Sequence, residues 1–129
     1  MSYSRSLMSA SAIALGLLGI GTFAPDEVIA RIGLPESRLA DLLVQSIGSV
    51  YLGFGMFNWM ARGSMMGGIY GRPLVMGNLL HFVTAGLAIW LRVTELSSLW
   101  ALAVVYLFFG AGFGLLLVRH PPRPAASRI

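Results

Sequence analysis

Four long stretches of the chain contain no charged residue, and short charged segments separate them. They are residues 6–25, 42–61, 73–91 and 96–118, with 19 to 23 residues each. An α-helix needs about this length to cross the ~30 Å hydrocarbon core at 1.5 Å per residue. The pattern predicts an all-α integral membrane protein, a four-transmembrane-helix up-down bundle made by one domain. With turn and capping residues considered, the expected spans are about 6–24, 36–61, 73–91 and 97–118.

The segment between the first two spans has helix signals of its own. A proline and two acids at 25–27 favour a helix start, and Gly33 followed by Pro35 favours its end. Its apolar residues fall on one side: Val28, Ile29 and Ile32. We therefore expect residues 26–33 to form a short outer interfacial helix lying flat on the membrane.

The second span has a row of small or flexible residues on one side, and this row predicts how the span packs. The residues are Ser46, Ser49, Gly53 and Met60. Small faces let helices approach closely in lipid, so we expect this row to face the other helices. The short glycine-rich segment 63–71 predicts an antiparallel hairpin of the second and third spans.

The two signs of charge are segregated between the connecting segments. Six arginines without any acid share one side, namely Arg5, Arg62, Arg72, Arg119, Arg123 and Arg128. All five acids lie on the other side with three arginines: Asp26, Glu27, Glu36, Asp41, Glu95, Arg31, Arg38 and Arg92. The positive-inside rule then predicts that both termini are cytoplasmic and that residues 119–129 form a cytoplasmic tail.

Composition narrows the class of protein. Charged residues make up 11% of the chain and apolar residues 57%, with a mean hydropathy of +0.78, whereas soluble domains carry about 25% charged residues. The absence of cysteine excludes disulfides and thiolate metal sites. The net charge of +4 arises from an excess of arginine at one membrane face, so membrane lipids rather than nucleic acid are the expected partner. All nine basic residues are arginine, which we interpret as codon bias in a GC-rich bacterium.

Few polar side chains lie inside the spans, and these are the candidate site residues. Asn58 and Asn78 lie at a similar depth and can bond to each other across two helices. His81 and Thr84 follow Asn78 at steps of three, on the same helix face. The simplest interpretation is a polar intramembrane cluster that joins helices, each bond contributing about 1 kcal/mol or less.

His81 also has two sharper interpretations. Gly77 lies one turn away and clears space for a flat ring, so His81 is a candidate tetrapyrrole ligand, although no second axial histidine lies within the spans. The other interpretation is a proton relay through His81, although no acidic residue lies within the membrane to exchange protons with it. The arginines Arg62, Arg72 and Arg119 are expected to fix topology and contact lipid phosphates. Alternatively, Arg62 and Arg72 bind an anionic ligand or a partner subunit.

Three short motifs carry a family resemblance. FAPDEV at 23–28, NWMAR at 58–62 and GRPLVMGNLLH at 71–81 resemble small uncharacterised four-helix bacterial membrane proteins, broadly DoxX-like in layout. The resemblance spans nearly the whole chain and implies topology and location only.

Together these features predict a non-enzymatic accessory or structural subunit of a bacterial inner-membrane protein complex, in contact with other membrane subunits or with itself. No acid or cysteine, and no metal cluster, lies within the four uncharged stretches to do enzyme chemistry. The alternative is a small oligomeric transporter or channel with Asn58, Asn78 and His81 lining its path.

Overall fold

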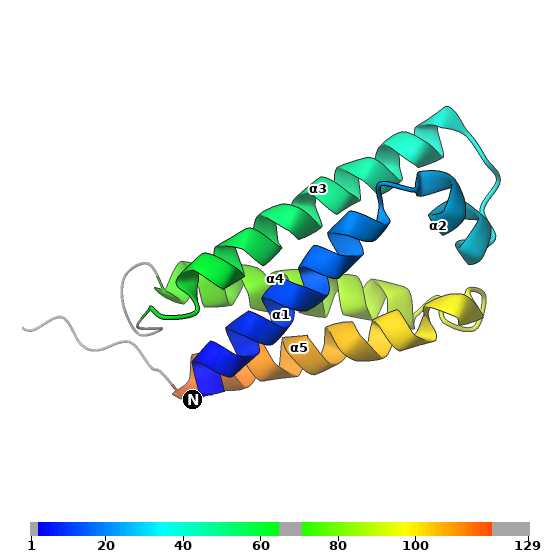
Figure 1. Ribbon diagram of the computed structural model, residues 1–129. Helices are drawn as coiled ribbons and strands as arrows, with labels where there is room; N and C mark the ends of the chain where they lie inside the picture. Colours follow the sequence, from blue (N-terminus) through cyan, green and yellow to red (C-terminus); the bar gives the residue numbers. More distant parts are fainter. Residues whose placement is uncertain (1–2, 65–70, 120–129) are drawn as a thin grey trace, which may run out of the picture.

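Four long helices dominate the structure, a computed structural model that describes residues 3–64 and 71–119. Those long and apolar enough to cross a membrane are α1 (Tyr3–Gly21), α3 (Arg38–Ala61), α4 (Gly71–Trp90) and α5 (Trp100–Arg119), the last preceded by the 3₁₀ turn η1 (Ser97–Leu99). Successive spans run in opposite directions (Figure 1). The predicted all-α four-helix membrane bundle is confirmed.

The helix bounds differ from the expected spans by a few residues, for local reasons. The second span begins at Arg38 rather than at 36, because the hydroxyl of Ser37 caps the helix by accepting the Ala40 N–H at 3.1 Å. The first span starts earlier, at Tyr3, and ends at Gly21. The predicted tail lies outside the described residues beyond Arg119.

The four spans form two closely packed pairs. Helix α1 packs along α3, and α4 packs along α5, whereas α3 and α4 contact each other much less. Glycines permit the close approach: a Cβ on Gly55 of α3 would lie 3.2 Å from the Ala12 carbonyl oxygen, and one on Gly110 of α5 would lie 2.9 Å from Val83 Cγ2. The second and third spans are therefore antiparallel neighbours, but they are not the tight hairpin that the short connection predicts.

The row of small residues on α3 faces away from the other helices, which corrects the prediction. Ser46 and Ser49 are exposed, Met60 is 73% exposed, and a Cβ on Gly53 would have no atom within 4 Å. The opposite side of α3 packs on α1 through other glycines. A Cβ on Gly48 would lie 1.7 Å from Oγ1 of Thr22, just beyond the end of α1, which leaves no space for a side chain there. Small residues therefore lie on two sides of α3, and the residue types alone do not show which side packs against another helix.

The short helix α2 (Pro25–Ile32) packs against α3 and η1 at one end of the bundle. It ends at Gly33, whose φ of 74° is left-handed, and the Gly33 and Leu34 N–H groups bond to the carbonyls of Ala30 and Ile29. The predicted helix at 26–33 is present. Its Ile29 is fully buried in the protein, however, while Val28 and Ile32 are partly exposed. Part of the apolar side expected on the membrane thus faces the bundle.

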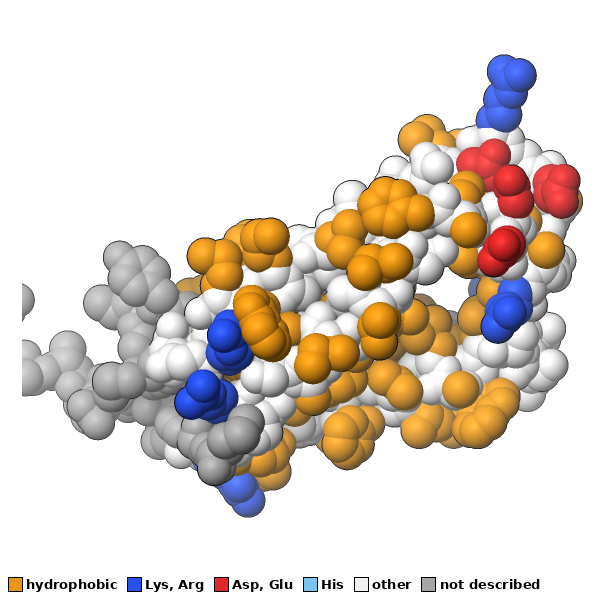
Figure 2. Space-filling view, viewed as in Figure 1, with side chains coloured by type: hydrophobic (Ala, Val, Ile, Leu, Met, Phe, Trp, Pro, Cys, Tyr) orange, Lys and Arg blue, Asp and Glu red, His pale blue; other side chains and the backbone are white. Residues whose placement is uncertain are grey.

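Charges lie at the two ends of the molecule and apolar side chains cover the middle (Figure 2). The acidic residues all belong to the end that holds α2, the start of α3 and the α4–α5 connection. The arginines at the opposite end are Arg5, Arg62, Arg72 and Arg119. We call this the arginine end. The fold therefore keeps the charge segregation seen along the chain.

Candidate functional site

Two asparagines face each other across α3 and α4 in the interior of the bundle. Asn58 and Asn78 are both fully buried. The Asn58 Nδ2 donates to Asn78 Oδ1 at 2.8 Å, and the Asn78 Nδ2 donates back to Asn58 Oδ1 at 2.7 Å. The pairing anticipated from their similar depth is therefore present in the structure.

A third helix joins this pair through Ser11 of α1, which the sequence reasoning missed. The Asn58 Nδ2 also donates to Ser11 Oγ at 2.9 Å, and Ser11 donates to the Met8 carbonyl at 3.1 Å. The second N–H of the Asn78 amide donates to the Leu74 carbonyl at 2.9 Å. Ser11 is one of several serines in a span rich in small residues, so its type alone did not mark it. We call Ser11, Asn58 and Asn78 the polar ring.

The polar ring is neutral, closed and internally satisfied. Both amide groups use both N–H hydrogens and their carbonyl oxygens within the ring or on the adjacent backbone. None of its members titrates, and none is accessible. Buried polar groups that are fully paired fix one arrangement of their helices, because each alternative leaves a donor or acceptor unpaired in a low-dielectric interior. The ring can therefore align α1, α3 and α4, and it offers no free group for catalysis.

His81 lies apart from the polar ring, among aromatic side chains. Its imidazole stacks on Phe54 with ring centroids 5.0 Å apart and planes 18° apart, and it lies 5.5 Å from the ring of Tyr106. Tyr51 approaches edge-on at 6.0 Å. The fourth predicted member of the cluster, Thr84, is exposed and donates to the Leu80 carbonyl of its own helix at 2.6 Å. The structure thus brings Asn58 and Asn78 together and leaves His81 and Thr84 outside their hydrogen bonds.

Two polar atoms in this aromatic cluster form no hydrogen bond of ordinary geometry with the described residues, namely the Nε2 of His81 and the hydroxyl of Tyr106. The Tyr106 hydroxyl nevertheless interacts with the Tyr51 side chain, whereas the Nε2 of His81 is buried without a partner among those residues. Such atoms cost about 1–3 kcal/mol each unless water or another group satisfies them. This is the part of the interior where polar bonding capacity remains unused.

Space for a flat ligand beside His81 is limited by Phe54. A Cβ built on Gly77 would lie 3.8 Å from Phe54 Cε1, so the phenyl ring occupies the side that the Gly77 spacing seemed to leave open. A tetrapyrrole on that side of the imidazole would require Phe54 to move. Within residues 3–64 and 71–119, no three His, Cys, Asp or Glu side chains gather to bind a metal.

The candidate arginines lie at the arginine end, next to aromatic rings. The guanidinium carbon of Arg62 lies 3.8 Å above the Trp59 ring, and its Nη1 donates to the Trp59 carbonyl. The guanidinium of Arg119 lies 5.5 Å from the centre of the Tyr3 ring. Arg72 is half-buried at the start of α4, and the segment between it and Arg62 lies largely outside the described residues. Arginine over an exposed aromatic ring is typical of the membrane interface.

Comparison of the chain with protein-family models, with curated proteins and with solved structures returns no match.

Proposed function

We propose that this protein is a non-enzymatic accessory or structural subunit of a bacterial inner-membrane protein complex, with both termini in the cytoplasm. One observation carries the proposal: the side of α3 that bears small and polar residues is left uncovered by the other helices of the chain. We call this side the open α3 face, and it is formed by Gln45, Ser49, Gly53, Met56 and Met60.

The open α3 face has the chemistry of a helix contact. Ser49 and Gly53 form a small-xxx-small pair, which allows a second helix to approach closely. The Gln45 side chain lies one turn beyond Asp41, about 6 Å further along the helix. It is exposed and has no hydrogen-bond partner among the described residues. An amide facing hydrocarbon without a partner is unfavourable, so a neighbouring membrane helix is the surface that suits it.

The interior supports a structural role rather than catalysis. The polar ring uses its hydrogen-bonding groups to connect α1, α3 and α4, and none of its atoms faces a channel or the surface. A subunit that holds a complex together needs a rigid bundle and an exposed contact face. The proposed function uses both.

Site-specific crosslinking tests the proposal. The chain has no cysteine, so Ser49→Cys carries a single bifunctional crosslinker in native membranes. We expect one adduct of defined mass with a different membrane protein. Ala88→Cys on α4, also exposed, is the matched control and should give none. Gly53→Leu should abolish the Ser49→Cys adduct, because the added side chain separates the helices. The absence of a heterologous adduct would contradict the proposal.

The transporter alternative is favoured by a separate observation, the buried Nε2 of His81, which has no hydrogen-bond partner among the described residues. A transport path that used Asn58 and Asn78 would have to open the polar ring during each cycle. The same experiment separates the two functions: a Ser49→Cys adduct with a second copy of the chain favours a homo-oligomer, and His81→Gln should then reduce transport.

A further inference from the structure

A groove runs between α1 and α5 at the arginine end. It has a volume of about 420 Å³ and is lined mainly by apolar side chains, among them Leu7, Ala10, Phe108, Phe109 and Leu115. The polar ring and the open α3 face do not contribute to it. Its size is within the range of about 300–1,000 Å³ typical of sites for small molecules.

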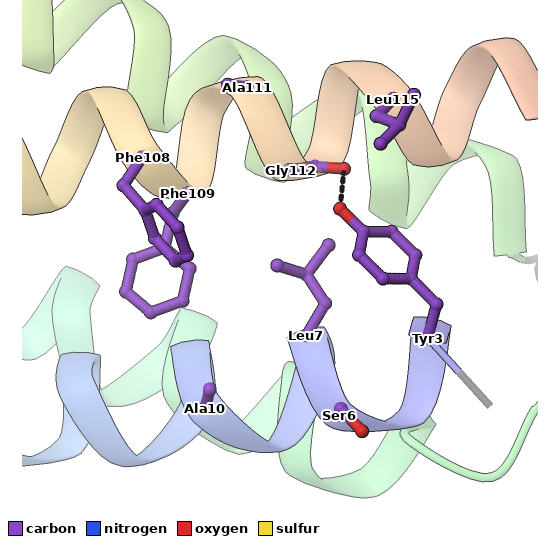
Figure 3. Close-up of a pocket in the computed structure, with 9 residues that line it drawn as sticks. All are labelled: Tyr3, Ser6, Leu7, Ala10, Phe108, Phe109, Ala111, Gly112 and Leu115. Atoms are coloured by element: carbon purple, nitrogen blue, oxygen red, sulfur yellow. Dashed lines mark hydrogen bonds between the residues drawn. The ribbon is translucent and has the colours of Figure 1, made fainter. Parts of the chain in front are cut away.

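The groove exists because α1 and α5 contact each other only lightly along their length. Tyr3 closes one end, where its hydroxyl donates to the Gly112 carbonyl at 3.1 Å (Figure 3). Leu7 reaches α5 beside Gly112, where a Cβ would lie 2.8 Å from Leu7 Cδ1. The Phe108 and Phe109 rings form the other end (Figure 3). The seam between the two helix pairs is therefore incompletely filled on this side.

The position of the groove matches one leaflet of a membrane. Its lining runs from residue 3 to 10 on α1 and from 108 to 115 on α5, which is about 10 Å along each helix. A leaflet contributes roughly half of the ~30 Å core. The groove is as long as one helix diameter, about 10–12 Å, so a helix would have to cross it at a steep angle. Part of a single acyl chain, which is much narrower than a helix, can lie along it.

A positive charge lies at the Tyr3 end of the groove. Arg119 is exposed, and its guanidinium lies over the ring of Tyr3, which lines the groove. The described residues at the arginine end include no acid. A guanidinium group that can donate bidentate hydrogen bonds to a phosphate thus lies where a lipid headgroup would be.

We propose that this groove is a binding site for an anionic phospholipid, which places part of one acyl chain between α1 and α5 and its phosphate beside Arg119. The lipid fills the seam and so links the two helix pairs. This inference does not depend on the proposed function, because it requires only that the arginine end lies at a membrane surface.

Native mass spectrometry of the purified protein with added phosphatidylglycerol or phosphatidylcholine of identical chains tests the site. We expect one retained phosphatidylglycerol and at least about tenfold weaker retention of phosphatidylcholine. Ala10→Trp, which fills the groove, should abolish retention, whereas the exposed Ala88→Trp on α4 should keep it. Arg119→Gln should remove the preference for the anionic lipid, and Arg31→Gln at the opposite end should not.

A second measurement keeps the test decisive if a variant folds poorly. A fluorophore on Ser6→Cys, which lines the groove, should be quenched by phosphatidylglycerol with brominated chains more strongly than one on Ala88→Cys. Equal quenching at both positions, or retention unchanged by Ala10→Trp, would overturn the proposal. A dimer that Ala10→Trp dissociates would assign the groove to a second copy of the chain instead.

Discussion

Asn58 and Asn78 exchange two hydrogen bonds, so that each amide is both donor and acceptor for the other. They do so across α3 and α4, which otherwise touch each other much less than either touches its close partner. The bond between them therefore lies where the two helix pairs meet, and Ser11 extends it to α1.

Removal of either amide should weaken the bundle, and the two losses should overlap. We expect Asn58→Leu and Asn78→Leu each to lower the free energy of unfolding by about 1–3 kcal/mol, because each leaves a buried amide without its partner. The double variant should lose less than the sum, by about 1 kcal/mol. Denaturant unfolding in a double-mutant cycle measures this coupling. Ser46→Ala, at an exposed serine, is the control, and additive losses would contradict a shared bond.

Two glycines on α3 should respond oppositely to alanine. A Cβ on Gly48 would lie 1.7 Å from Thr22 Oγ1, and Thr22 must then rotate and lose its 2.7 Å bond to the Gly19 carbonyl. We expect Gly48→Ala to cost about 1–3 kcal/mol. A Cβ on Gly53 meets nothing within 4 Å, so Gly53→Ala should be neutral or stabilise the isolated protein by up to about 1 kcal/mol. Thermal unfolding in detergent compares them. Equal effects would mean that α1 and α3 are not closely packed there.

His81 can be tested by the shape and the chemistry of its replacements. If it only packs among aromatic rings, His81→Phe keeps the stacking on Phe54 and removes the unpaired Nε2, so stability should change by less than about 1 kcal/mol. His81→Gln should also stay folded and active. Absorption spectra and unfolding curves check both variants. Loss of a bound pigment, or of activity in folded His81→Gln, would instead identify a ligand or a proton carrier.

Orientation in the membrane follows from the charge segregation and is open to direct measurement. Reporter fusions after Gly63 and at the C-terminus should both report the cytoplasm, while a fusion after Arg31 should report the periplasm. The physical reason is the excess of arginine at the end that holds Arg5, Arg62, Arg72 and Arg119. A periplasmic C-terminus would overturn the predicted topology.

Helix α2 offers a matched pair of isoleucines. Ile29 is fully buried, while Ile32 is partly exposed. We expect Ile29→Ala to lower the free energy of unfolding by about 2–4 kcal/mol and Ile32→Ala by less than about 1.5 kcal/mol. Unfolding in lipid nanodiscs measures both. A larger loss at Ile32 would indicate that α2 is held mainly by the membrane.

The spans were predictable because hydrocarbon penalises charge and unpaired backbone so strongly that the uncharged stretches had to be helices. The sides by which the helices pack against each other were not predictable. On α3 small residues occur both at Gly48 and Gly55, which face α1, and at Ser49 and Gly53, which face outward. In water the polar side would have marked the surface, but in lipid both sides are apolar or small.

The candidate site was predictable in part for a related reason. Asn58 and Asn78 were found because amides are rare in membrane spans and these two share a depth. The neighbours of His81 depend on where Phe54, Tyr51 and Tyr106 from α3 and α5 meet α4. Aromatic residues are common in such spans, so the sequence does not show which of them meet around His81. Their contact depends on how the helices pack.

The division into two helix pairs predicts an order of events during biosynthesis. Helices α1 and α3 are synthesised first, so we expect them to pack on each other before α4 is made. At that stage Asn58 already has Ser11 as a partner, whereas Asn78 enters the bilayer later with the carbonyl of Leu74 as its other bond. We expect the last step of assembly to be the docking of one helix pair on the other, and until it occurs each pair contains an amide with only part of its hydrogen bonds. The two asparagines that join the helix pairs in the complete bundle thus have unpaired groups before the pairs meet.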